Sequence, residues 1–240
     1  MPISPDFTSI YSQNFEIGFQ HCYPTGFLKH TEICNFFQIV AGIHADLGGI
    51  SYLDMQECHQ AWVLSRMRVE ITKLPKWKDV ITIKTWIKTL ENSRSIRCLE
   101  MYLNDQKIVG CETFWVVINT KTRKPDSLAL PHAHFEKLDT DSISKPIQKI
   151  NIPENFTFKN EKTIQLSDID IVNHANNVKY LEWCLDVTHL ENVLSQKIKA
   201  LNLNYLQELN YDDAIEIHHT ENHFLITKEG KSCFALEVEL

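Results

Sequence analysis

The sequence lacks the features that mark a membrane or secreted protein. No apolar run approaches the roughly 18 residues that a membrane helix needs, so we expect no membrane span. Residues 1–6 contain no basic region followed by an apolar stretch, so no signal peptide is indicated. These two absences make the cytoplasm the expected compartment.

Cysteine and glycine patterns of well-known metal and nucleophile sites are also missing. The chain has 7 cysteines, an odd number without a Cys-x-x-Cys pair, which argues against a disulfide framework or a zinc ribbon. The pairs His132/His134 and His218/His219 have no cysteine or carboxylate at a familiar ligand spacing. We therefore expect no metal and no other cofactor. Without Gly-x-Ser-x-Gly, a serine nucleophile on a strand-to-helix elbow is not indicated.

Positive charge is scarce as well. The chain carries 24 Lys and Arg against 31 Asp and Glu, and its net charge of −7 argues against a broad surface for nucleic acid or anionic membrane. The hydrophobic share of 43% and the charged share of 23% are typical of a globular protein. A chain of 240 residues can bury one large core or form two joined domains.

Hydrophobic periodicity predicts the same order of elements twice. The first copy has a strand at 15–19, a helix at 28–47 that ends at Gly48 and Gly49, and strands at 62–72, 80–90, 94–103 and 107–120. Asn104 and Asp105 are predicted to form a hairpin connection between the last two of these strands. The second copy has a strand at 156–166, a helix at 178–194, and strands at 198–209, 214–219, 224–227 and 233–240. Proline and mixed charge without periodicity mark the stretch between them as a linker.

This repeated order predicts an α+β fold with an internal duplication. A helix wrapped by a strongly curved antiparallel sheet is the hotdog arrangement, so two copies make a double hotdog. We place the N-terminal hotdog at 1–122, the linker at 123–154 and the C-terminal hotdog at 155–240.

One stretch, 167–180, concentrates chemistry at the start of the second helix. It reads Ser-Asp-Ile-Asp-Ile-Val-Asn-His-Ala-Asn-Asn-Val-Lys-Tyr and brings Asp170 and His174 close to a helix N-terminus. Asn176 or Asn177 is suited to cap that helix, whose free N–H groups could stabilise a developing oxyanion. The alternative is a structural loop, because Asp and Asn often hydrogen-bond to their own backbone.

The string Asp-x-x-x-His-x-Asn-Asn-x-x-Tyr resembles the motif that opens the C-terminal helix of acyl-carrier-protein thioesterases. Four further segments are similar to that family in the same order: Trp-Val-Leu-Ser-Arg-Met-Arg-Val at 62–69, Pro-Lys-Trp-Lys-Asp-Val at 75–80, Phe-Trp-Val-Val-Ile-Asn-x-x-Thr-Arg at 114–123 and Leu-Asn-Tyr-Leu-Gln-Glu at 203–208. The resemblance implies hydrolysis of long- or medium-chain acyl-ACP to free fatty acid, with acyl carrier protein as partner.

The resemblance also implies roles for individual residues. It assigns catalysis to Asp170, His174 and Glu208 in the C-terminal hotdog, with water as the attacking group. The family has an asparagine midway between its Asp and His, where this chain has Val172, so we predict that Asn173 partly fills that role.

The N-terminal hotdog is implied to bind the fatty-acyl chain. Trp62 and Arg66 are its candidate substrate-binding residues.

Other readings of the same sequence stay open. An acyl-CoA thioesterase, a non-catalytic acyl-binding hotdog protein and a hotdog dehydratase would share these elements. A homodimer is open too, although two hotdogs in one chain can already mimic the usual dimer. For carrier-protein docking there are two candidate basic clusters: Lys121, Arg123 and Lys124, or Lys73, Lys76 and Lys78.

Overall fold

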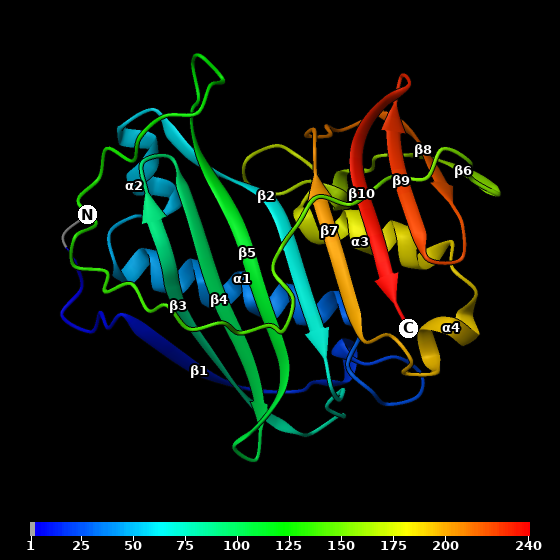
Figure 1. The fold of residues 1–240 in the computed structure, drawn as a ribbon, viewed down its shortest axis with the longest axis horizontal. Helices are drawn as coiled ribbons and strands as arrows, with labels where there is room; N and C mark the ends of the chain where they lie inside the picture. The colour runs from blue at the N-terminus through cyan, green and yellow to red at the C-terminus, as the bar shows by residue number, and fades with distance from the viewer. Residues whose placement is uncertain (1–2) are drawn as a thin grey trace.

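Ten antiparallel strands form one sheet in the computed structural model, which describes residues 3–240. Their order across the sheet is β1-β3-β4-β5-β2-β7-β10-β9-β8-β6 (Figure 1). The strands are β1 (Ile10–Glu16), β2 (Gln60–Ile71), β3 (Val80–Glu91), β4 (Arg94–Leu103), β5 (Gln106–Asn119), β6 (Phe158–Thr163), β7 (Ala200–Tyr205), β8 (Ala214–His219), β9 (His223–Lys228) and β10 (Lys231–Glu239).

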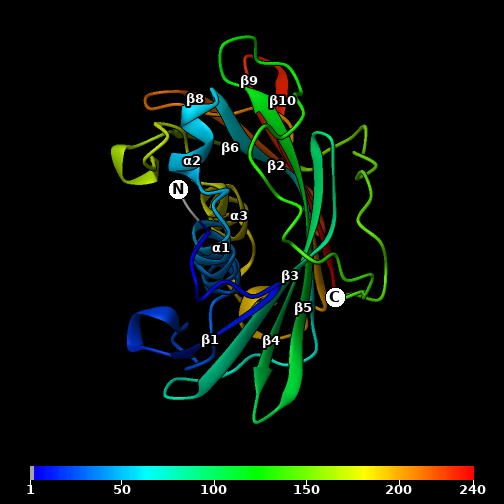
Figure 2. The ribbon, with the colours of Figure 1, turned by 90° about the vertical axis from the view of Figure 1, so that its left-hand side faces the viewer.

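The sheet curves around two helices that share one face of it. Figure 2 shows α1 (His30–Leu47) and α3 (Asn177–Asp186) enclosed on the concave side, where their apolar side chains join one core. Each half of the chain contributes a strand, a longer and a shorter α-helix, and four more strands in that order. The predicted α+β double hotdog is therefore confirmed. Within residues 3–240 no helix is long and apolar enough to cross a membrane.

Local sequence signals account for several element ends. Helix α1 stops at Leu47, and Gly49 follows with a φ of 68°, a conformation that glycine adopts without strain. Asn104 and Asp105 have φ values of 50° and 60°, which suits the two-residue hairpin between β4 and β5. Both turns lie where the sequence predicts them.

Other boundaries differ from the prediction. The single helix expected at 178–194 is two helices, α3 and the short α4 (Leu190–Leu194). Helix α3 ends at Asp186, and just beyond it the Thr188 Oγ1 donates 2.9 Å to the carbonyl oxygen of Cys184. The strand expected at 198–209 ends at Tyr205, and α2 (Tyr52–Glu57) was not predicted.

The two halves are joined through the centre of the sheet. Strand β2 of the first half pairs with β7 of the second, from Arg66 opposite Asn204 to Glu70 opposite Ala200. Beside this seam the buried Arg68 donates 2.8 Å to Glu70 and 2.7 Å to Glu239. A buried guanidinium needs such partners, so this network favours one continuous sheet.

The connection between the halves crosses the convex face of the sheet (Figure 1; Figure 2). Of the described residues, those from 120 to 157 form no helix or strand. Ser142 anchors this stretch, donating 2.6 Å from its Oγ to the carbonyl of Cys111. Gly110 permits the close approach, because a Cβ there would lie 1.9 Å from the carbonyl oxygen of Ser142. The domain boundaries at 122 and 154 stay predictions.

The first turn of α1 contains a histidine that should make stability depend on pH. His30 is fully buried, with Nδ1 3.0 Å from the Tyr23 hydroxyl and no partner for Nε2 among the described residues. Burial lowers the pKa of His30 from 6.5 to about 4. The unfolded chain therefore takes up this proton below pH 6.5, while the folded chain resists it until near pH 4. The contribution of His30 to the free energy of unfolding is therefore complete above pH 6.5 and falls as the pH is lowered.

His30 should lower the free energy of unfolding by about 1.4 kcal/mol for each pH unit below 6.5. Between pH 7 and pH 5 we therefore expect the wild type to lose about 2 kcal/mol more than His30→Gln. Urea denaturation at both pH values measures the difference. Parallel losses in the two proteins would show that His30 is not the titrating group.

Candidate active site

The loop before α3 folds into a tight turn that Asp170 holds together. The Asp170 N–H donates 2.9 Å to the His174 carbonyl, and Asp170 Oδ1 accepts from the Val172 N–H at 3.0 Å. Asn173 donates its N–H 2.9 Å to the Asp170 carbonyl and has a φ of 62°. This turn presents the His174 side chain just before the helix begins.

A second segment, after the end of β7, is tied to this loop through Leu209. Its carbonyl accepts 2.8 Å from the Ala175 N–H, and its own N–H donates 3.0 Å to the Tyr180 hydroxyl. These bonds place the residues just before Ala175 and Leu209 side by side. As a result His174 Nε2 lies 3.5 Å from Glu208 Oε2.

Both side chains line a cavity of about 550 Å³ between the two halves of the chain. The same Glu208 oxygen that faces His174 is paired with Arg123 from the turn after β5. The cavity is lined by Trp62, Val63, Leu64, Ile118, Arg123, Asp170, Val172, His174, Ala175, Asn177, Tyr180, Tyr205, Leu206, Gln207, Glu208 and Asn210. Residues from both halves of the chain therefore surround the pair of Glu208 and His174.

Helix α3 points its N-terminus at the same cavity. Asn176 is its N-cap, since its side-chain oxygen accepts 3.0 Å from the Val178 N–H, as predicted. Asn177, the first helical residue, lines the cavity, and its N–H has no acceptor among the described residues. Because free N–H groups and the helix dipole favour negative charge, this position can stabilise an oxyanion.

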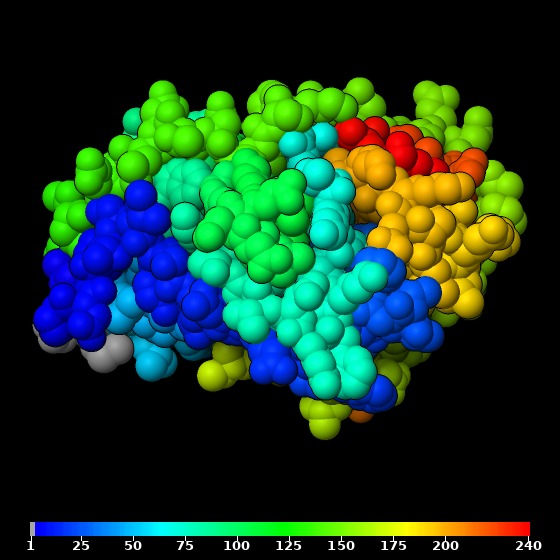
Figure 3. Space-filling model, turned by 90° about the horizontal axis from the view of Figure 1, so that it is seen from below, coloured from blue at the N-terminus to red at the C-terminus, as the bar shows by residue number. Residues whose placement is uncertain are grey.

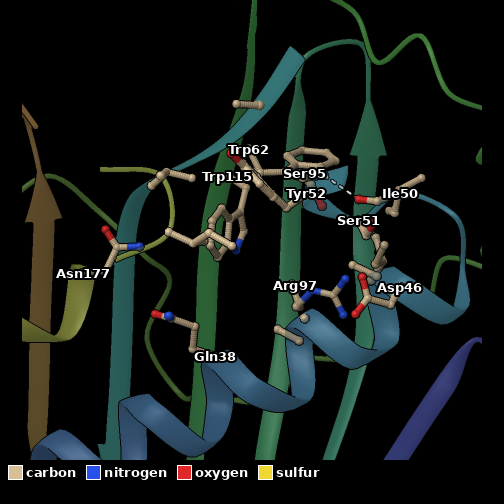
Figure 4. Close-up of a pocket in the computed structure, with 17 residues that line it drawn as sticks. Gln38, Asp46, Ile50, Ser51, Tyr52, Trp62, Ser95, Arg97, Trp115 and Asn177 are labelled. Atoms are coloured by element: carbon tan, nitrogen blue, oxygen red, sulfur yellow. Dashed lines mark hydrogen bonds between the residues drawn. The ribbon is translucent and has the colours of Figure 1, made fainter. Parts of the chain in front are cut away.

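A second cavity, of about 380 Å³, lies between α1 and strands of the first half (Figure 4). Trp62, Val172 and Asn177 line both cavities, so the two adjoin. In Figure 4, Trp62 and Trp115 lie on the sheet side and Gln38 projects from α1, with Asn177 at one edge. The Trp62 indole N–H donates 3.2 Å to the Ile50 carbonyl, which leaves the ring face to line the cavity.

Arg97 on β4 also lines this second cavity although it is only 7% exposed. Its Nη1 is 2.8 Å from His44 Nδ1 and 3.2 Å from Thr85 Oγ1, and no carboxylate of the described residues pairs with it. Burial lowers the pKa of Arg97 to about 10, and burial together with the Arg97 charge lowers that of His44 to about 3. The cavity is therefore apolar for most of its wall but has a cation at one side.

Sequence comparison identifies the family. The profile of the acyl-ACP thioesterase N-terminal domain matches residues 8–130, and that of the C-terminal domain matches residues 153–238. The chain belongs to the acyl-ACP thioesterase family.

Curated and solved relatives agree with the two profiles. The chloroplastic oleoyl-acyl carrier protein thioesterase of Coriandrum sativum is 26% identical over an alignment of 230 residues, and the match covers 86% of this chain and 61% of that protein. The acyl-ACP thioesterase structure from Bacteroides thetaiotaomicron is 25% identical, with a TM-score of 0.87 over 96% of this chain and 97% of that one. The 12:0-ACP thioesterase from Umbellularia californica shares the fold at 19% identity and a TM-score of 0.82, over 97% of each chain. The chain thus spans about three fifths of the length of the curated coriander protein.

Three of the predicted catalytic residues line one cavity: Asp170, His174 and Glu208. The Asp170 carboxylate contacts Asn176 Nδ2, 3.4 Å away, and not the imidazole of His174. Glu208 lies three residues beyond the end of β7, because β7 is shorter than predicted.

Two predicted residues lie elsewhere. Arg66 stacks on Phe114, 4.8 Å from the ring centre, and lines neither cavity. Side chains alternate along β5, so Phe114 faces away from the interior that its neighbour Trp115 lines. Asn173 is exposed at the tip of its turn and lines neither cavity, and Asn176 supplies the amide beside Asp170 instead.

Arg123 and Tyr180 also line the catalytic cavity, although the motifs that contain them predicted no such position. Arg123 was considered only for docking, because a charged residue in a turn after a strand carries no signal of its contact with Glu208.

We expect the backbone of Asn173, and not its side chain, to matter for turnover. Glycine adopts a φ of 62° without strain, so Asn173→Gly should keep the rate within about threefold, whereas Asn173→Ala should weaken the turn. Steady-state rates and thermal unfolding of both variants measure this. If Asn173→Gly stays folded but its steady-state rate falls strongly, the Asn173 amide has a catalytic role after all.

Proposed function

We propose that this protein hydrolyses the thioester of long- or medium-chain acyl-ACP and releases free fatty acid for fatty acid biosynthesis. The observation that carries the proposal is the junction of its two cavities. A carboxylate–imidazole pair at a helix N-terminus lines one of them, and the adjoining one is mostly apolar. The first suits the thioester, and the second suits the acyl chain.

The geometry supports water as the nucleophile. Glu208 takes a proton from water, whose oxygen attacks the carbonyl carbon, and the oxyanion forms at the N–H of Asn177. The C–S bond then breaks, and the departing sulfur receives a proton through His174, 3.5 Å from Glu208. The products are a fatty acid and a free thiol.

Asp170 is better placed to hold the loop than to attack the substrate. One of its carboxylate oxygens accepts from the Val172 N–H and the other from Asn176. Either oxygen that formed a mixed anhydride would have to weaken the hydrogen bond that it accepts in this loop. This favours general-base catalysis by Glu208 over a nucleophilic carboxylate.

The position of the basic residues supports acyl carrier protein as partner. Lys121 and Lys124 flank Arg123 in the turn beside the catalytic cavity and form no ion pair within residues 3–240. An acidic carrier could approach the cavity over this turn.

The second basic cluster lies at the wrong end of the sheet for this role. Strand β2 has 12 residues at about 3.3 Å per residue, so Lys73, beyond its end, lies up to about 36 Å from Trp62. Figure 1 places the β2–β3 turn at the opposite end of the sheet from the turn after β5. Figure 3, a view from below, shows the β2–β3 turn exposed on that far face.

Release of free thiol from a purified acyl-ACP, followed with a thiol-reactive dye, tests the proposal. Hydrolysis gives a signal, whereas dehydration or simple acyl binding gives none. The same acyl group on coenzyme A tests the alternative, and faster release from acyl-CoA would favour a CoA thioesterase. Chromatography of the fatty acids from expressing cells identifies the chain length. A cytoplasmic location belongs to the proposal and agrees with seven cysteines that all have free thiols.

A further inference from the structure

The contact between Arg123 and Glu208 engages the carboxylate oxygen that faces His174. Glu208 Oε2 is paired with Arg123 and lies 3.5 Å from His174 Nε2. Arg123 follows β5 at the start of the predicted linker, whereas the other two residues come from the C-terminal hotdog. The ion pair therefore spans the cavity between the halves and leaves that oxygen less free to accept a proton from water.

The backbone at Arg123 is held by hydrogen bonds, whereas its side chain is free to move. Asn119 ties the turn, accepting from the N–H groups of Lys121 and Thr122 at 3.0 Å each and from that of Arg123 at 2.8 Å. The side chains of Arg123 and Glu208 are nevertheless 54% and 33% exposed. Ion pairs with this exposure contribute little to stability, so another anion can replace Glu208 at low cost.

The cavity offers an incoming anion no other permanent cation. Among its lining residues within 3–240, Arg123 is the only lysine or arginine. Lys121 and Lys124 beside it add positive charge on the outer side of the turn. A guanidinium is suited to phosphate and carboxylate oxygens because its planar N–H groups bind both in a bidentate manner.

We propose that Arg123 is an exchangeable latch: it holds Glu208 in the free enzyme and transfers to an anionic group of the substrate's carrier when the thioester enters. The anion is the phosphodiester of the phosphopantetheine arm or a carboxylate of the carrier beside it. Transfer releases Glu208 to act as base only when a carrier is bound. Arg123 is thus a positioning residue that couples carrier binding to hydrolysis, and this inference rests on the proposed function.

Three substrates with one acyl group separate the parts of this inference. Acyl-pantetheine has no anion, acyl-phosphopantetheine adds phosphate, and acyl-ACP adds the carrier as well. In Arg123→Gln, kcat/KM for acyl-pantetheine should rise a few-fold because Glu208 is free. For acyl-ACP it should fall at least about tenfold, the scale of a lost bond to a charged group. A fall with acyl-phosphopantetheine assigns the phosphate, and a fall with acyl-ACP alone assigns carrier carboxylates.

Lys197→Gln is the matched control. Lys197 is exposed in the turn before β7, and the expected ratio of the three rates is that of the wild type. Equal losses on all three substrates in Arg123→Gln, or no change on any, would overturn the latch. Circular dichroism of each variant confirms that it is folded.

A binding measurement keeps the inference separate from the proposed activity. Acyl-ACP with an amide in place of the thioester cannot be hydrolysed, so its Kd depends on contacts alone. The Kd should rise at least about tenfold in Arg123→Gln at low salt, and less at high salt. An unchanged Kd contradicts the latch even if the enzyme is active. Absence of thiol release from every substrate by the wild type contradicts the proposed function instead.

Discussion

Glu208→Gln should lower the rate of acyl-ACP hydrolysis by about 10²–10⁴ while the protein stays folded. Glutamine keeps the shape of the side chain and one acceptor oxygen but cannot take a proton from water. The backbone at this position is set by the bonds of Leu209 to Ala175 and Tyr180, which the substitution leaves in place. Single-turnover hydrolysis of purified acyl-ACP measures the chemical step without product release.

Glu221→Gln is the control for this experiment. Glu221 is an exposed glutamate in the turn between β8 and β9, so the same change of charge occurs away from the cavity. Its rate should equal that of the wild type. A folded Glu208→Gln protein within a few-fold of wild type would show that Glu208 is not the base, and Asp170 would then be the next carboxylate to test.

His174→Gln should also slow hydrolysis by about 10²–10⁴, because no other imidazole lines the catalytic cavity of the described chain. The double variant with Glu208→Gln should be no slower than about the slower single variant, since two groups that serve one proton transfer are not additive. Single-turnover rates of the two single variants and the double variant test this relation.

His223→Gln is the matched histidine change. His223 is on β9, with its Nε2 3.6 Å from Glu237, outside the cavity. It should leave the rate unchanged. If the losses from His174→Gln and Glu208→Gln multiply in the double variant, the two residues act independently, and the proposed sharing of one proton path is wrong.

Local sequence patterns were sufficient to predict much of the fold. The helical periodicity of 28–47 with Gly48 and Gly49 after it predicted α1, whose last residue is Leu47. The pair Asn104 and Asp105 predicted a hairpin, because these residues tolerate the positive φ that a two-residue turn requires. Such signals act over a few residues and need no knowledge of distant contacts.

The sequence was less informative where a distant residue decides the structure. Arg66 and Trp62 belong to one motif, yet only Trp62 lines the cavities, because a register shift between Leu64 and Arg66 alters how β2 faces its partner strand. Strand alternation could not reveal that irregularity.

The sequence by itself determined the repeated order of elements, a helix N-cap at Asn176 or Asn177, and the loop that carries Asp170 and His174. Only the tertiary structure brought Glu208 to His174, through the bonds of Leu209 across two segments, and only it paired Arg123 with that carboxylate. The physical reason is sequence separation. Caps, turns and periodicity depend on neighbours a few residues apart, whereas this site depends on contacts across 34 and 85 positions of the chain, which the curvature of a shared sheet brings together.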